Sequence, residues 1–172
     1  KDLQKIEIDF IKNVNVNVIF TPEHGIEGNY QAGERISNNE SYNIPVISLY
    51  GKNNKPKDSY IKNLDAIFFD IQDIGVRYYT YASTMTLAME KAVQNDIEFM
   101  VLDRPNPLTG ATQGAVLDLD FSSFVGMHPI PVRHGLTIAE LALFIKNNNT
   151  KNGKKKIWFY GSYFFSGCFV GR

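Results

Sequence analysis

Short apolar runs that end abruptly in polar residues recur along this chain. The sharpest case is Asp65–Tyr81 (DAIFFDIQDIGVRYYTY), in which Ala66–Phe69 is apolar throughout and the residues that follow are largely carboxylate, amide, arginine and tyrosine side chains. A continuous apolar run of this length is typical of a strand buried on both faces. Val14–Phe20 and Glu98–Leu102 also pass directly into polar residues. Strands that end in this way form the mouth of a site in an open α/β sheet.

The remaining periodicity predicts strands that alternate with helices. We expect helices where apolar residues recur at three- and four-residue spacing, and strands where apolar runs are bounded by Gly or Pro. The predicted helices cover residues 1–13, 56–64, 81–94 and 137–146, and the predicted strands cover 14–20, 44–50, 66–69, 98–102 and 155–159. Residues 26–43 and 105–136 are predicted to be long loops. This alternation predicts an α/β fold with a doubly wound, mostly parallel sheet.

Composition narrows the possible functions. The chain has 172 residues, enough for one domain with its own core, and Lys+Arg and Asp+Glu both number 18. Because the charges balance, we expect no nucleic-acid partner. No apolar run is long enough to span a bilayer, and Cys168 is the single cysteine, so an internal disulfide is excluded. Neither a GxGxxG nor a P-loop motif occurs, so nothing predicts a nucleotide cofactor.

The carboxyl ends of parallel strands meet at one edge of a sheet, so the polar residues that follow three of the strands should converge there. Two chemistries suit such a set. One is acid–base hydrolysis of a sugar linkage, in which a protonated carboxyl gives the leaving oxygen its proton. The other is metal-assisted hydrolysis with His24, His128, His134 and the aspartates as ligands, but the histidines lack a compact metal-binding spacing and we predict no metal. The candidates at this edge are Glu23, His24, Asp70, Asp73, Arg77, Asp103, Arg104 and Asn106.

Several of these residues have structural alternatives. Asp70 and Asp73 are also suited to capping a turn or pairing with Arg77, and Asp103 and Arg104 to satisfying each other in a rigid turn. Thr80 is a predicted N-cap, and Thr137-x-x-Glu140 is a predicted capping box. The tyrosines after the third strand are equally suited to a core with wet hydroxyls. Glu23, between Pro22 and Gly25 at a strand end, has no evident packing role, which favours a functional one.

Four segments, in this order, resemble the family labelled DUF1343, whose characterised members are exo-β-N-acetylmuramidases, the NamZ group of glycoside hydrolases. Four long motifs make the resemblance specific, and it runs from about Phe10 to Phe144. The segments are Thr21–Gly28 (TPEHGIEG), Asp70–Tyr81 (DIQDIGVRYYTY), Val101–Pro107 (VLDRPNP) and Pro131–Ala142 (PVRHGLTIAELA).

The resemblance implies a Rossmann-like catalytic domain of three α/β/α layers. It also implies removal of a terminal N-acetylmuramic acid from the non-reducing end of peptidoglycan fragments, and export from the cell, although this chain carries no signal peptide. By motif, Glu23 is the leading catalytic carboxylate, with Asp70 and Asp73 as further candidates. The implied substrate-binding residues are His24, Gln72, Arg77, Tyr79, Tyr81, Asp103, Arg104, Asn106, Arg133 and His134.

The chain departs from the family pattern in ways that keep alternatives open. We expect residues 1–150 to form the catalytic domain without its N-terminal portion, residues 151–172 to be a divergent tail, and the auxiliary C-terminal domain of the family to be missing. Gln113 stands where a Glu is expected, so a non-catalytic muropeptide binder or an inactive fragment is an alternative, and a metal-dependent hydrolase is a further one. An arginine among Arg77, Arg104 and Arg133 is the expected partner of the lactyl carboxylate of muramic acid.

Overall fold

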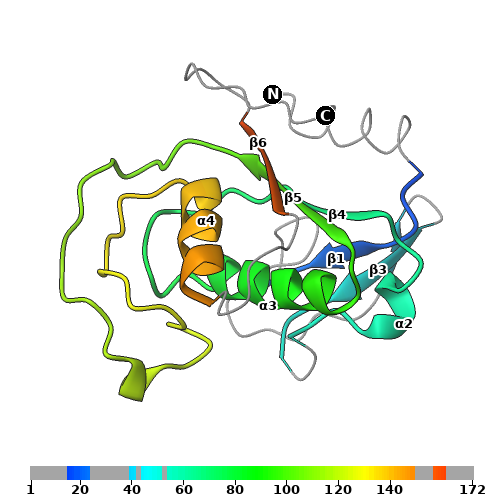
Figure 1. The fold of residues 1–172 in the computed structure, drawn as a ribbon, viewed down its shortest axis with the longest axis horizontal. Coiled ribbons are helices and arrows are strands. Elements are labelled where there is room, and N and C mark those ends of the chain that lie inside the picture. Colours follow the sequence, from blue (N-terminus) through cyan, green and yellow to red (C-terminus); the bar gives the residue numbers. More distant parts are fainter. Residues whose placement is uncertain (1–14, 24–38, 42–43, 52–53, 150–156, 162–172) are drawn as a thin grey trace. The chain divides into compact units, whose positions relative to one another are not determined.

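The computed structural model describes residues 15–23, 39–41, 44–51, 54–149 and 157–161 (Figure 1). The chain divides into two compact units, residues 1–60 and 61–172, and each is described by itself. The helix predicted over residues 1–13, most of the loop predicted over 26–43, and His24 lie outside the described residues.

The first unit contains a three-stranded sheet in the order β1-β3-β2. Strand β1 (Ile19–Thr21) runs parallel to β3 (Ile44–Ser48), with Ile19 opposite Val46, and β2 (Asn39–Ser41) runs antiparallel to β3. The strand predicted from Val14 is therefore shorter than expected. The prediction of loop throughout 26–43 is wrong at β2, because an edge strand is held by backbone pairing and needs no apolar pattern.

The second unit contains a parallel sheet in the order β4-β5-β6. Strands β4 (Ala66–Phe69) and β5 (Glu98–Asp103) lie where the sequence predicts them, and β6 (Ile157–Gly161) extends the sheet slightly later than predicted. A single helical turn, α2 (Asp58–Ile61), replaces the longer helix predicted over 56–64. A long loop that carries a short 3₁₀ turn at Leu119–Phe121 connects β5 to the next helix (Figure 1).

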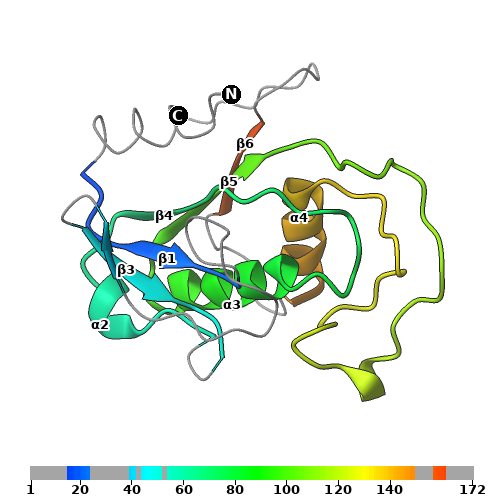
Figure 2. The same cartoon turned by 180° about the vertical axis from the view of Figure 1, so that it is seen from behind.

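Two helices cover the β4-β5-β6 sheet. Helix α3 (Tyr81–Gln94) has the predicted bounds, and α4 (Ile138–Asn149) runs three residues further than predicted. The helices contact each other and both pack on β5, as the opposite views of Figures 1 and 2 show. Phe99 and Val101 on β5 have no exposed surface, and their alternation with half-buried Met100 and Leu102 shows which face of the strand the helices cover.

The two helix starts differ in how they are capped. At α4 the predicted capping box is present: Thr137 N donates to Glu140 Oε2 over 2.8 Å, and Glu140 N donates to Thr137 Oγ1 over 3.2 Å. At α3 the N-cap residue is Thr80, as predicted, but its side chain makes no capping hydrogen bond. Thr80 already has right-handed helical backbone angles (φ −72°, ψ −5°) and makes no capping bond, because that bond requires an extended residue at the N-cap.

The fold class is the predicted one, a Rossmann-like α/β fold with mostly parallel strands. No helix among the described residues has the length and the apolar character needed to cross a bilayer. The predicted division at residue 150 into a domain and a tail stays a prediction.

Candidate active site

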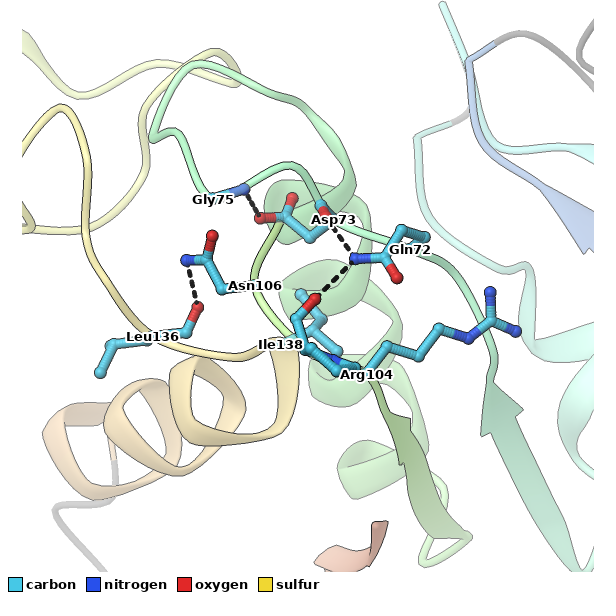
Figure 3. A pocket seen from close by; sticks show the side chains of 8 residues that line it. Gln72, Asp73, Gly75, Arg104, Asn106, Leu136 and Ile138 are labelled. Atoms are coloured by element: carbon cyan, nitrogen blue, oxygen red, sulfur yellow. Dashed lines mark hydrogen bonds between the residues drawn. The ribbon is translucent and has the colours of Figure 1, made fainter. Parts of the chain in front are cut away.

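A small pocket lies beyond the carboxyl ends of β4 and β5, at the edge where the sequence analysis expects the site (Figure 3). It is a shallow depression with about 150 Å³ of space between the atoms, part of it open solvent. It does not enclose a whole ligand, so a sugar bound there would extend beyond the residues that line it. The lining residues are Gln72, Asp73, Gly75, Arg104, Pro105, Asn106, Leu136 and Ile138.

Asp73 and His134 form a buried acid–imidazole pair beside this pocket. Asp73 is 5% exposed and His134 is 3% exposed, and His134 Nε2 lies 3.5 Å from Asp73 Oδ2. Leu136 N donates to His134 Nδ1 over 3.2 Å, which leaves the proton of a neutral ring on Nε2, facing Asp73. Asp73 Oδ2 also accepts from Gly75 N over 2.8 Å, whereas the buried Oδ1 has no hydrogen-bond partner.

A buried carboxylate oxygen without a partner is costly, so it is characteristic of a site that acquires a partner on binding. A ligand hydroxyl or amide N–H is the kind of group that Asp73 Oδ1 is suited to receive. Among the predicted carboxylates of the second unit, Asp73 therefore has the strongest structural claim to contact a substrate.

Asp70 and Gln72 tie the loop after β4 to the loop after β5. Asp70 Oδ1 accepts from Arg104 Nη2 in an ion pair, and both side chains are about a quarter exposed, 28% and 23%. Gln72 Nε2 donates to Asp73 O over 2.7 Å and to Pro105 O over 3.1 Å, as Figure 3 shows. The predicted pairings with Arg77 and between Asp103 and Arg104 are wrong. The predicted turn cap is present at Asp73, whose Oδ2 accepts from Gly75 N two residues later.

Asn106 fixes the wall opposite Gln72. Its Nδ2 donates to Leu136 O over 2.9 Å, and its Oδ1 accepts from Leu108 N over 2.9 Å. Gly75 has a φ of +81°, and a Cβ built there would lie 2.3 Å from Asn106 Oδ1. Glycine is therefore required at position 75 both by its backbone angle and by the closeness of Asn106.

Asp103 is engaged at the start of α4. Its Oδ2 accepts from Thr137 Oγ1 over 2.9 Å, and its Oδ1 accepts from Ala139 N over 3.0 Å. A carboxylate at a helix N-terminus satisfies an otherwise unpaired backbone N–H and interacts favourably with the helix dipole. Asp103 thus anchors α4 to the end of β5, and it does not line the pocket.

Four predicted binding residues of the second unit make other contacts. Arg77 Nη1 donates to Ala115 O and Ile130 O, both over 2.7 Å. Arg133 Nη1 donates to Gln113 Oε1, and its Nη2 lies 3.5 Å from Leu108 O. The Tyr79 and Tyr81 rings contact edge to face with centroids 4.6 Å apart. None of the four is among the residues that line the pocket, and their part in binding stays a prediction.

Gln113, where the family pattern leads us to expect Glu, is exposed and lies outside the pocket. Its backbone pairs with Arg133 in both directions, through Gln113 N to Arg133 O at 3.0 Å and Arg133 N to Gln113 O at 2.9 Å. The Gln113 side chain adds a third link to the same arginine. Its evident role is to hold two stretches of the long loop together.

The histidines do not assemble a metal site within the described part of the chain. No group of three or more His, Cys, Asp or Glu side chains suited to a metal ion occurs there. His128 Nε2 lies 2.8 Å from Thr86 Oγ1, which itself donates to Ala82 O on α3. Burial lowers the pKa of His128, and Glu90 opposes that shift, so His128 is a neutral side chain that fastens the loop to the helix.

Glu23 belongs to the first unit. It lies two residues after the end of β1 and is half-buried, whereas Thr21 and Pro22 before it are buried. Ser48 ends the neighbouring strand β3 opposite Thr21 and is also buried, so both parallel strands of this unit end in polar groups. This is the position at which open α/β sheets place ligands. The catalytic role predicted for Glu23 stays a prediction, and the neighbouring His24 is not described.

Sequence reasoning missed Gly75, Pro105, Leu136 and Ile138 as lining residues. Gly75 had a usable signal, because it lies within the densest polar stretch, two residues after Asp73 and two before Arg77, and a glycine there often permits close approach. Pro105, Leu136 and Ile138 had no such signal, because apolar residues that line a pocket look like any other apolar residues in the sequence.

Comparisons with known proteins show which family the chain belongs to. The family model described as exo-β-N-acetylmuramidase NamZ, N-terminal, matches residues 3–163. The chain belongs to the NamZ family. The match extends beyond the stretch from Phe10 to Phe144 that the four motifs delimit.

One curated protein and two crystal structures are similar to this chain. The chain is 50% identical over 133 residues to a protein of Bacillus subtilis (strain 168) named peptidoglycan β-N-acetylmuramidase NamZ, covering 76% of this chain and 32% of that protein. Two crystal structures of DUF1343 family proteins from Bacteroides fragilis NCTC 9343 also match. One has a TM-score of 0.75 and 42% identity, and the other has a TM-score of 0.72 and 34% identity.

Both structural matches cover 91% of this chain, and they cover 39% and 41% of the solved chains. The sequence therefore spans about a third of the length of the curated relative and about two-fifths of the solved ones.

Proposed function

We propose that this chain carries the catalytic part of an exo-β-N-acetylmuramidase, a glycoside hydrolase that releases N-acetylmuramic acid from the non-reducing end of peptidoglycan fragments. The observation that carries the proposal is the 50% identity, over three-quarters of the chain, to a peptidoglycan β-N-acetylmuramidase. The strand-end pocket with its buried carboxylate supports it.

In this proposal Glu23 is the general acid. It gives its proton to the glycosidic oxygen as the bond to the anomeric carbon breaks, so that the leaving sugar departs as an alcohol. Water then supplies the new oxygen on the anomeric carbon and loses a proton to a carboxylate. A carboxyl that follows a strand end and is half-buried is placed suitably for such a role.

Asp73 is the proposed substrate-orienting carboxylate. Its free Oδ1 would accept a hydrogen bond from a sugar hydroxyl or the acetamido N–H, while Gly75 N donates to Oδ2 and His134 Nε2 lies 3.5 Å from Oδ2. His134 therefore acts through Asp73, as a positioning residue. Asp70 is less suited to proton transfer, because its Oδ1 is bound to Arg104.

A chromogenic N-acetylmuramide tests the proposal directly. We expect the chain to release the chromophore, the Glu23→Gln variant to lose nearly all activity, and the Asp73→Asn variant to retain turnover with weakened substrate binding. Lys62→Gln, at an exposed position that does not line the pocket, is the matched surface control. Equal release by wild type and Glu23→Gln would remove Glu23 from the mechanism.

The same experiment decides the alternatives. Saturable binding of N-acetylmuramic acid without release of the chromophore would indicate a non-catalytic binder. Gln113, the observation behind that alternative, is exposed and is not among the residues that line the pocket. Release that a chelator abolishes would indicate a metal-dependent hydrolase. Export of the protein also stays a proposal, which fractionation of the producing cells would test.

A further inference from the structure

Muramic acid differs from glucosamine by a lactyl ether that ends in a carboxylate, so an enzyme selective for it needs a cationic partner for that group. Three arginines are candidates by sequence, and their contacts separate them. Resting on the proposed function, we propose that Arg104 binds the lactyl carboxylate and thereby sets the selectivity of this site for muramic acid.

The other two arginines are engaged elsewhere. Arg77 uses Nη1 for two backbone carbonyls of the long loop, and its backbone N–H is bound to Val132 O over 2.8 Å. Arg133 uses Nη1 for Gln113 and directs Nη2 at the oxygens of Leu108 and Thr109. Neither side chain is among the residues that line the pocket.

Arg104 is among the lining residues, and it has free donors. It lines the pocket, its side chain is 23% exposed, and in Figure 3 it extends past Gln72, away from Asn106. Among the described residues its polar partner is Asp70, which occupies Nη2. The remaining N–H groups of the guanidinium are in the planar arrangement that a carboxylate accepts in bidentate form.

The ion pair with Asp70 orients the Arg104 side chain and leaves other guanidinium N–H groups able to bind a ligand. Partly exposed pairs of this kind are weak, and one nitrogen engaged by Asp70 still leaves an edge of the guanidinium for a second carboxylate. Arg104 is also the one arginine or lysine among the residues that line the pocket, where Asp73 supplies negative charge. Asp73 would repel an anionic substituent, and Arg104 offsets that repulsion.

The discriminating experiment compares two ligands that differ only in the carboxylate. N-acetylmuramic acid and its lactyl methylamide are titrated calorimetrically into the whole chain at moderate ionic strength. We expect wild type to prefer the acid, Arg104→Gln to bind the acid about 10- to 100-fold more weakly and the amide nearly as before, and Arg104→Lys to be intermediate. Lys62→Gln removes the same charge at an exposed site and should leave the preference intact.

Two further variants protect the interpretation from a folding artefact. Asp70→Asn removes the ion pair but keeps the guanidinium, so the preference for the acid should persist or increase. Arg133→Gln tests the competing arginine and should leave the preference unchanged. Circular dichroism and a denaturant titration of every variant establish that each is folded.

The proposal is overturned if wild type binds neither ligand or binds both equally, if Arg104→Gln keeps the preference, or if Arg133→Gln removes it. Turnover of the chromogenic muramide, measured on the same samples, separates this proposal from the proposed function. A carboxylate preference that depends on Arg104 in a chain without turnover supports the subsite and contradicts hydrolysis. Turnover with no dependence on Arg104 supports hydrolysis and contradicts the carboxylate subsite.

Discussion

Replacing Gly75 with alanine should disrupt the pocket, because the new Cβ would overlap a side chain that lines it. Gly75 has a φ of +81°, and the new Cβ would lie 2.3 Å from Asn106 Oδ1 and 2.6 Å from Asn106 Nδ2. Contacts this short do not occur, so Asn106 must move. Its bonds to Leu136 O and Leu108 N are then lost together, and with them the wall of the pocket opposite Gln72.

The expected cost follows from these parts. An L residue in the left-handed region costs about 1–2 kcal/mol, and two lost hydrogen bonds cost about 0.5–1.5 kcal/mol each. The free energy of unfolding should therefore fall by roughly 2–5 kcal/mol, enough to threaten a domain of ordinary stability. Urea denaturation followed by fluorescence measures this change, and the affinity for N-acetylmuramic acid should fall in parallel.

Two glycines supply matched controls. Gly51 has nearly the same backbone angle, φ +84°, but a Cβ there would meet nothing within 4 Å, so Gly51→Ala should show the backbone cost alone, about 1–2 kcal/mol. Gly110→Ala, where the nearest atom would be 3.9 Å away, should be close to neutral. Equal losses for Gly75→Ala and Gly51→Ala would refute the reasoning, because Asn106 would then be free to move without penalty.

Three other perturbations test the structural roles assigned above. Asp103→Ala removes both acceptors at the start of α4, so unfolding free energy should fall by about 1–2 kcal/mol in a urea titration; an unchanged midpoint would contradict the anchoring role. Burial lowers the pKa of His128 from its usual 6.5, so the folded chain keeps it neutral where the unfolded chain binds a proton. Stability should thus be lost as the pH falls below about 6.5, and His128→Gln should flatten that slope between pH 5 and 8, whereas an identical slope would rule out this origin. Gln113→Glu turns an exposed hydrogen bond to Arg133 into an ion pair, so stability should change by less than about 1 kcal/mol; a large gain in muramide turnover would instead restore Gln113 as a catalytic position.

The local elements of the second unit were largely predictable from the sequence. Ala66–Phe69 and Tyr81–Gln94 have the predicted bounds because a continuous apolar run and a helical stripe each bury a core face. The Thr137–Glu140 capping box was predictable because it is a local interaction. The strand β2 was not, because it depends on pairing with β3 and not on its own side chains.

The candidate site was predictable in position and less so in detail. The rule that ligands lie at the carboxyl ends of parallel strands located Asp73, Arg104 and Asn106, which do line one pocket. Which side chains pair was not predictable, because it depends on contacts between segments about 30 residues apart. Asp103 accepts hydrogen bonds from Thr137 and Ala139. Arg104, its neighbour in sequence, instead donates to Asp70.

The most direct test of the proposed activity is which bond of a peptidoglycan fragment the protein hydrolyses. Two peptidoglycan fragments that differ only at the non-reducing end, one ending in N-acetylmuramic acid and the other in N-acetylglucosamine, are incubated with the whole chain, and the products are separated by liquid chromatography and mass spectrometry. The account predicts free N-acetylmuramic acid from the first fragment alone, and none from either fragment with Glu23→Gln. Cleavage within both fragments, or equal release by the Glu23→Gln variant, would contradict it.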